Sequence, residues 1–202
     1  ADFDLHYYAF NAATGRLLWQ IVTWRNYKIP IPLPVSLGED RLFFTGGYGI
    51  GCFSLAVKKD GDRWEATYGF RNNNVACHIH TPILYKGSLY CPSFNTHFVP
   101  NRNGLVCLDL AGNIRWQTGP DRVFHDGAML LADGMIYQLD GDTGELYLIE
   151  AGPAAYRQLA KAKVLTAKGK MAWAPMALSD GKLIVRDLHQ MKCLDVRGPK
   201  AP

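Results

Sequence analysis

The sequence lacks several common functional signatures. It contains no Cys-x-x-Cys pair, no Gly-x-Ser-x-Gly motif and no run of 18 apolar residues. These absences argue against a zinc ribbon, a thioredoxin-type site or attached c-type haem, leave an α/β-hydrolase without a nucleophile, and exclude a membrane-spanning helix. No run of basic residues is longer than two and the net charge is only +4. We therefore expect no nucleic-acid partner.

The composition is that of a globular protein rich in turns. Of the 202 residues, 48% are hydrophobic and 20% are charged, which excludes intrinsic disorder and suits one domain. Aromatic residues make up 12%, and 20 glycines and 11 prolines favour many short strands. Residues 1–10 lack a basic region followed by an apolar run, so they are not expected to be a signal peptide. The five cysteines are predicted to be small buried hydrophobes, and Cys91 and Cys107, on neighbouring strands, could pair in an exported protein.

An internal repeat is the strongest pattern in the chain. Four segments align without gaps, and their last residues lie 47 positions apart: 31–42, 78–89, 125–136 and 172–183. Each predicts a strand, a tight turn with an acidic residue or glycine, and a second strand. A third strand follows a variable loop. Residues 7–11 resemble another copy of that third strand, and Trp19, Trp64 and Trp116 mark fourth strands.

Four antiparallel strands in a repeat of this length predict the blade of a β-propeller, so the fold class is all-β. The tryptophans are expected between neighbouring blades. The blade pieces are 5–24, 29–68, 77–119, 125–167 and 172–197, all within one propeller domain or part of one, 1–202. The fourth piece lacks a tryptophan strand. Residues 154–165 intervene there, and Tyr156 and Leu159 at i, i+3 predict a short helix or an extended loop.

The stretches 8–19 and 105–116 resemble the repeat of pyrroloquinoline-quinone (PQQ)-type β-propellers, in which an apolar strand, Asp or Asn, a glycine turn and Trp follow in order. The resemblance covers nearly the whole chain and extends to the last blades of bacterial exported members. It implies a ring of seven or eight blades, of which this chain would be a part of about four. The alternatives are a small four-bladed ring and an assembly with another chain. It also implies a periplasmic or extracellular location.

The positions of the histidines indicate where a functional site would lie. Strand order predicts that the loops before first strands and the loops between second and third strands lie at one end of the disc, where all six histidines fall. His78 and His125 occupy equivalent repeat positions, and His78 and His80 share one side of a strand. His78, His80 and His125 are candidate ligands of a divalent metal, with Asp126 as a further ligand or as the partner of His125. Rim histidines bonded to loop backbone are the alternative.

Three functions remain open. The first is a non-catalytic binding or scaffold module outside the cytoplasm, with a protein partner or another chain of an assembly. The second is implied by the resemblance: a quinoprotein oxidoreductase of the alcohol-dehydrogenase type, with PQQ and calcium near the axis and a small-molecule ligand in the central channel. The sequence lacks the adjacent cysteine pair of that class, and Asp60, Asp133, Asp140, Asp142 and Asp180 are interpreted as turn formers at the other end or along blade edges. The third is the metal-binding propeller. Residues 45–51 are glycine-rich, but they lie between two strands and not before a helix, so a phosphate site is not expected.

Overall fold

The computed structural model describes residues 4–25, 31–93, 103–122, 124–167 and 172–198, and the side chains of 4, 5 and 23–25 are not among the described features. Within these described residues, seventeen strands form five antiparallel sheets, which we number as blades 1 to 5. Blade 1 contains β1 (Asp4–Phe10) and β2 (Leu17–Arg25). Blade 2 contains β3 (Val35–Gly38), β4 (Arg41–Gly46), β5 (Gly51–Asp60) and β6 (Arg63–Asn72).

The remaining blades follow the same plan. Blade 3 contains β7 (Ile83–Tyr85), β8 (Ser88–Ser93), β9 (Gly104–Leu108) and β10 (Ile114–Gln117). Blade 4 contains β11 (Met129–Ala132), β12 (Met135–Leu139), β13 (Glu145–Glu150) and β14 (Gln158–Lys163). Blade 5 contains β15 (Ala177–Ser179), β16 (Lys182–Arg186) and β17 (Met191–Asp195). Each sheet pairs its strands in chain order, as a meander.

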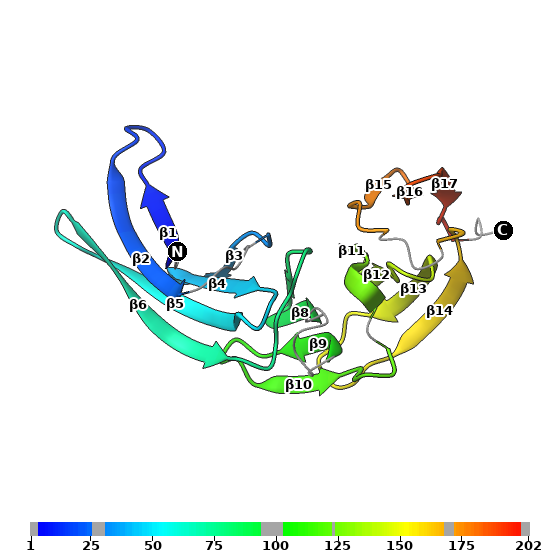
Figure 1. Cartoon of the computed structure of the whole chain (residues 1–202), viewed down its shortest axis with the longest axis horizontal. Coiled ribbons are helices and arrows are strands. Elements are labelled where there is room, and N and C mark those ends of the chain that lie inside the picture. Colours follow the sequence, from blue (N-terminus) through cyan, green and yellow to red (C-terminus); the bar gives the residue numbers. More distant parts are fainter. Residues whose placement is uncertain (1–3, 26–30, 94–102, 123, 168–171, 199–202) are drawn as a thin grey trace.

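The blades follow one another around an open arc (Figure 1), with the fourth strands β6, β10 and β14 along its outer side. The prediction of an all-β fold of four-stranded antiparallel blades is confirmed. The described residues form part of a propeller. The hairpins between first and second strands turn at Lys86-Gly87, Asp133-Gly134 and Asp180-Gly181, where both residues have positive φ. That is the geometry of the two-residue turn that matches the twist of paired strands.

The core lies between the blades. Four hydrophobic clusters join blade 1 to 2, 2 to 3, 3 to 4 and 4 to 5. Alternate residues of a second strand serve opposite neighbours: Leu89 packs against blade 2, while the adjacent Tyr90 packs against blade 4. Leu89, Ile136 and Leu183, at equivalent positions of the 47-residue repeat, are all fully buried. A single blade therefore needs a neighbour on each side to remove its apolar faces from water.

Trp116 lies between blades 3 and 4, as predicted for the repeat's tryptophans. Its side chain is buried, and its ring lies 6.0 Å from that of Tyr90 and 5.9 Å from that of Tyr156. Its indole Nε1–H donates a 3.0 Å hydrogen bond to the carbonyl of Gly152. Gly152 and Tyr156 belong to the connection between β13 and β14, so the Trp116 side chain links blade 3 to blade 4.

Of the two alternatives for 154–165, the short helix is wrong, whereas residues 154–157 form an extended loop. Gln158–Lys163 form β14, which pairs along β13 and completes blade 4 without a tryptophan. The side chains of β14 are all exposed. Tyr156, whose spacing from Leu159 suggested a helix, lies before the strand and packs on Trp116. Backbone pairing with the open edge of β13 outweighs a local pattern that was only one turn long.

The cysteines are free thiols, and four of the five are buried. Register explains why Cys91 and Cys107 do not pair: Cys107 lies opposite Tyr90 and Cys91 opposite Val106, so the two thiols lie on opposite faces of blade 3. Burial is the main cause of the raised pKa of the thiols of Cys52, Cys91 and Cys107. The interpretation of these residues as small buried hydrophobes is confirmed for four of them.

Thiol labelling tests this arrangement. A maleimide reagent added to the folded protein is expected to modify Cys193, the one exposed cysteine among the described residues, and to leave the buried four unmodified. After denaturation all five should react. Mass spectrometry counts the adducts, and rapid modification of Cys91 in the folded protein would contradict the burial described here.

Candidate functional site

The segments that precede the first strands of blades 3, 4 and 5 meet at one place. We call Tyr48, His78, His80, Asp126 and Trp173 the histidine cluster. His78 precedes β7, Asp126 precedes β11 and Trp173 precedes β15, while Tyr48 lies in the loop between β4 and β5. Residues 47–50 of the glycine-rich stretch 45–51 form the predicted loop between a second and a third strand, and the two ends of the stretch belong to β4 and β5. At Gly47 it passes so close to His78 that an added Cβ would lie 2.7 Å from the imidazole Cδ2.

His78 and Asp126 form the central contact of the cluster. Nδ1 of His78 lies 2.8 Å from Oδ2 of Asp126, and both side chains are buried. The edges of Tyr48 and Trp173 meet the imidazole at 4.9 and 6.2 Å between ring centroids. Since a carboxylate oxygen only accepts, Nδ1 of His78 is the donor of this hydrogen bond. The contact with Asp126 thus fixes the orientation of the His78 imidazole beside the rings of Tyr48 and Trp173.

His80 lies close to the same acid. Burial lowers the pKa of His80, and the carboxylate and backbone carbonyl of Asp126 oppose that shift. Its Nε2 is buried and has no hydrogen-bond partner among the described residues. A buried polar atom without a partner is uncommon and costs free energy.

A left-handed turn carries Asp126 to this place. Phe124, His125 and Asp126 have φ values of 56, 42 and 58°, a conformation that is strained for residues with a side chain. The backbone N–H groups of Gly127 and Gly141 both donate 2.9 Å hydrogen bonds to the carbonyl of Phe124. Strain of this kind persists only where the surroundings hold it. Here the close packing of Gly127 and Gly141 against the turn keeps it in this conformation.

His125 faces other acids than His78 does. Its Nδ1 lies 3.2 Å from Oδ2 of Asp140, and its Nε2 lies 3.8 Å from Oδ2 of Asp142. Asp140 also accepts the backbone N–H groups of Asp142 and Thr143. Burial alone would raise the pKa of Asp140, but the bonds from His125 and from Thr143 and Asp142 outweigh it, and the pKa is lowered.

Sequence reasoning missed the role of Asp140. It is a turn former, as interpreted, but it lies beside His125 and not at the opposite end or on a blade edge. The signal was available, because Asp140 begins the loop between a second and a third strand, which strand order places at the histidine end. His78 meets Asp126, the neighbour of His125, and not His125 itself. Across the described residues, no three His, Cys, Asp or Glu side chains form a group suited to a metal ion.

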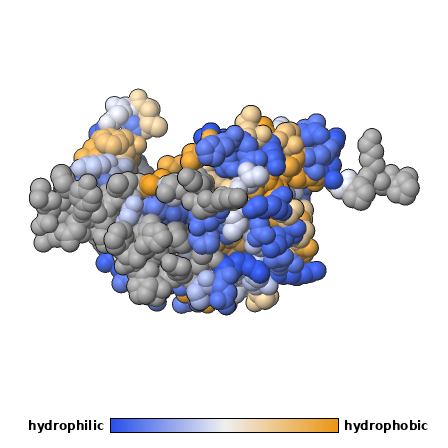
Figure 2. All heavy atoms as spheres, turned by 45° about the vertical axis from the view of Figure 1, so that its right-hand side comes forward, coloured by the Kyte–Doolittle hydropathy of each residue, from blue (hydrophilic) through white to orange (hydrophobic). Residues whose placement is uncertain are grey.

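The outer face of blade 1 is largely apolar and exposed within the described residues, with the exposed Gln20 opposite Tyr8. His6, Tyr8 and Phe10 project from this face, and their rings stack in sequence at 5.8 and 6.2 Å. Tyr8 is 51% exposed and Phe10 is 59% exposed, with exposed Leu17 and Val22 on the paired strand. Figure 2 shows the hydrophobic side chains on this projecting hairpin, at upper left. The opposite face, with Tyr7, Trp19 and Ile21, packs on blade 2.

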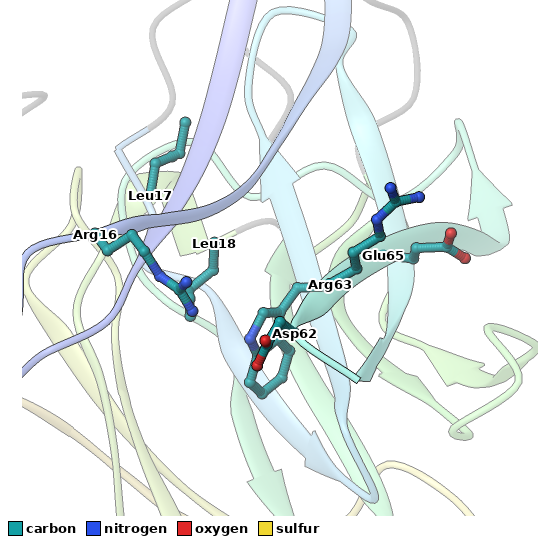
Figure 3. Close-up of a pocket in the computed structure, with 7 residues that line it drawn as sticks. Arg16, Leu17, Leu18, Asp62, Arg63 and Glu65 are labelled. Atoms are coloured by element: carbon teal, nitrogen blue, oxygen red, sulfur yellow. The ribbon is translucent and has the colours of Figure 1, made fainter. Parts of the chain in front are cut away.

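A surface cleft elsewhere is lined by both charged and apolar side chains. A cleft of about 300 Å³ lies between the β1–β2 turn and the β5–β6 turn (Figure 3). It is lined by two arginines, two acids and three apolar side chains: Arg16, Leu17, Leu18, Asp62, Arg63, Trp64 and Glu65. Both signs of charge are present, so the cleft selects no class of ligand. No helix in the described part of the chain has the length and apolar character needed to cross a membrane.

Comparisons with known proteins add little beyond the fold. No protein-family model matches the chain, and no curated protein does. Among solved structures, one that is similar to this chain is BamB from Moraxella catarrhalis, at 13% sequence identity and a TM-score of 0.40. The match covers 90% of this chain and 63% of that one, so this chain spans less than two thirds of its length.

Proposed function

We propose that this chain is a non-catalytic binding module of the bacterial cell envelope, a propeller-type scaffold that holds a protein partner on the outer face of blade 1. The observation that carries the proposal is the stacked row of His6, Tyr8 and Phe10 on that face. A contiguous apolar surface rich in aromatic rings is typical of protein interfaces. The location rests on the resemblance to exported PQQ-type propellers.

Burial at equivalent positions supports the same proposal. Ala9 pairs with Trp19 as Cys107 pairs with Trp116, so Tyr8 and Phe10 correspond to Val106 and Leu108 of blade 3. Both of these are fully buried against blade 2. Covering apolar surface contributes roughly 25 cal/mol per Å². A partner that covers the outer face of blade 1 buries apolar surface there. Its binding is stabilised in the same way as the contact between two neighbouring inner blades.

Photo-crosslinking in the source cells tests the proposal. A photoreactive phenylalanine analogue placed at position 8 is expected to give one discrete protein adduct. The same analogue at position 159, an exposed leucine on β14 of another blade, is the matched control and should give none. Absence of an adduct at position 8, or an equal yield at 159, would overturn the proposal. Release of the protein by osmotic shock tests the envelope location, and retention with cytosolic markers would contradict it.

Metal binding is a second proposal. Two observations favour it: the unpartnered Nε2 of His80, and the contact of Asp126 with Nδ1 of His78, an arrangement common around metal-bound histidines. Equilibrium dialysis against Zn²⁺ is expected to show about one ion per chain. His80→Gln should abolish binding while His189→Gln, on another loop, should not. No bound zinc, or unchanged binding in H80Q, would overturn it. The quinoprotein alternative stays a prediction.

A further inference from the structure

Three of the four buried cysteines lie in one apolar cluster, between blades 2 and 3. Cys52 comes from β5, Cys91 comes from β8, and Cys77 comes from the segment that leads into β7. All three side chains are fully buried. Packing alone does not require sulfur at three adjacent places, because alanine or valine serves equally well in an apolar cluster.

Two of these thiols are in direct contact. The thiols of Cys77 and Cys91 are hydrogen-bonded to each other, whereas the interaction of Cys52 with them is electrostatic. A hydrogen bond between two thiols brings the sulfur atoms close together. Little movement therefore separates this pair from a covalent S–S bond.

Two hydroxyl groups fix the backbone at Cys77. Its N–H donates a 3.0 Å hydrogen bond to Oγ1 of Thr45, on β4 of blade 2. The N–H of Ala76 donates a 3.0 Å hydrogen bond to Oγ of Ser93, which lies two residues after Cys91 on the same face of β8. The side chains of Thr45 and Ser93 are both buried. Cys77 is therefore held against β8 before any covalent bond forms, and pairing requires little further ordering.

We propose that Cys77 and Cys91 are a redox pair, which closes to a disulfide when the chain meets a disulfide oxidant such as oxidised glutathione. This inference goes beyond the proposed function and does not depend on it. The thiolate of one cysteine attacks the S–S bond of oxidised glutathione and releases one glutathione thiolate. The thiolate of the second cysteine then attacks the mixed disulfide and releases the other. Two cysteine thiols are oxidised, one glutathione disulfide is reduced, and the two protons pass to the released glutathione thiolates.

Burial determines when this reaction occurs. Both thiols are fully buried, and burial is the main cause of the raised pKa of Cys91, so the thiolate is scarce in the folded chain. Exchange requires local opening of the contact between blades 2 and 3. The pair is therefore expected to oxidise slowly in the folded chain and quickly while the chain folds. Once closed, the disulfide is shielded from reductants in the same way.

The disulfide acts on the segment that carries the histidine cluster. It closes a loop between positions 77 and 91, and this loop restricts the unfolded chain. His78 follows Cys77 directly, so oxidation ties the lead-in segment of blade 3 covalently to β8. The pair is thus a redox-sensitive crosslink beside that cluster.

Non-reducing peptide mapping tests the inference on the full chain with Cys193→Ser, a change that removes the exposed thiol. The reduced chain is unfolded and then refolded in a buffer of oxidised and reduced glutathione, and the remaining free thiols are alkylated in denaturant. Trypsin cleaves after Arg71, Lys86 and Arg102, so it separates the two cysteines of the pair. The expected product is one disulfide between peptides 72–86 and 87–102, with the other two cysteines alkylated.

Alanine variants provide the controls. Cys91→Ala should lose the linked peptides, while Cys107→Ala, on the opposite face of blade 3, should keep them. Oxidation should raise the urea midpoint of C107A by about 1 M and leave that of C91A unchanged. A parent chain that keeps all four thiols, or one in which Cys52 pairs with Cys77 as the main product, would overturn the proposal. The peptide map of the parent chain decides the question even where a variant does not fold.

Discussion

Replacing Trp116 with alanine is expected to lower the free energy of unfolding by about 3–5 kcal/mol, the usual loss on truncating a large buried aromatic residue. The change removes the contacts of the indole with Tyr90 and Tyr156, and leaves the Gly152 carbonyl without its donor. Because these contacts join blades 3 and 4, the loss falls on the contact between blades and not on one sheet. Urea denaturation followed by circular dichroism measures it.

Trp64 provides the matched control. It also lies on a fourth strand, but it is half-buried, and the ammonium of Lys59 lies 5.8 Å from its ring. Trp64→Ala is expected to cost about 1 kcal/mol, the scale of an exposed cation–ring contact. Equal losses for W64A and W116A would show that Trp116 does not fasten the two blades as described.

Replacing Gly127 with alanine is expected to destabilise the protein by about 3 kcal/mol or more, the upper end for changes that overfill a packed region. An added Cβ would lie 1.8 Å from the carbonyl oxygen of Leu139, which is backbone and cannot rotate away. The left-handed turn at Phe124–Asp126 depends on this close passage. G127A should therefore also displace Asp126 from His78.

Gly152→Ala is the control for that change. Gly152 does not have a positive φ, and the nearest atom to an added Cβ is the Cγ of Glu150 at 3.9 Å. G152A is expected to change the free energy of unfolding by less than about 0.5 kcal/mol. Chemical shifts of the His78 imidazole report on the second effect, and an unchanged spectrum in folded G127A would contradict the proposed dependence of Asp126 on the turn.

Much of the architecture could be predicted because it repeats. The 47-residue interval, the turn residues and the tryptophan of the fourth strand recur in several blades, and each recurrence constrains the others. Where the repeat breaks, at 154–165, the extended loop was predicted correctly for residues 154–157 but the strand at 158–163 was not predicted. A single turn of helical spacing stood alone there against the pairing edge of β13.

The histidine end was only partly predictable. Strand order brought the lead-in segments of the blades to one side, and His78 and Asp126 do meet there. Which acid each histidine contacts depends on the left-handed turn at Phe124–Asp126, and no local sequence pattern predicts the positive φ values of that turn. That turn separates Asp126 from its neighbour His125, which faces Asp140 instead. Exposure of Tyr8 and Phe10 was equally out of reach, because their pattern matches the buried Val106 and Leu108.

Hydroxyl-radical footprinting of repeat-equivalent residues at low protein concentration distinguishes covered faces of the blades from exposed ones. The inner faces are covered by neighbouring blades, whereas we propose that the outer face of blade 1 is free to bind a partner. We expect rapid oxidation of Tyr8, Phe10 and Met191, with Tyr90, Leu108 and Tyr137 protected. Equal oxidation of Tyr8 and Tyr90 in the dilute, folded chain would contradict it.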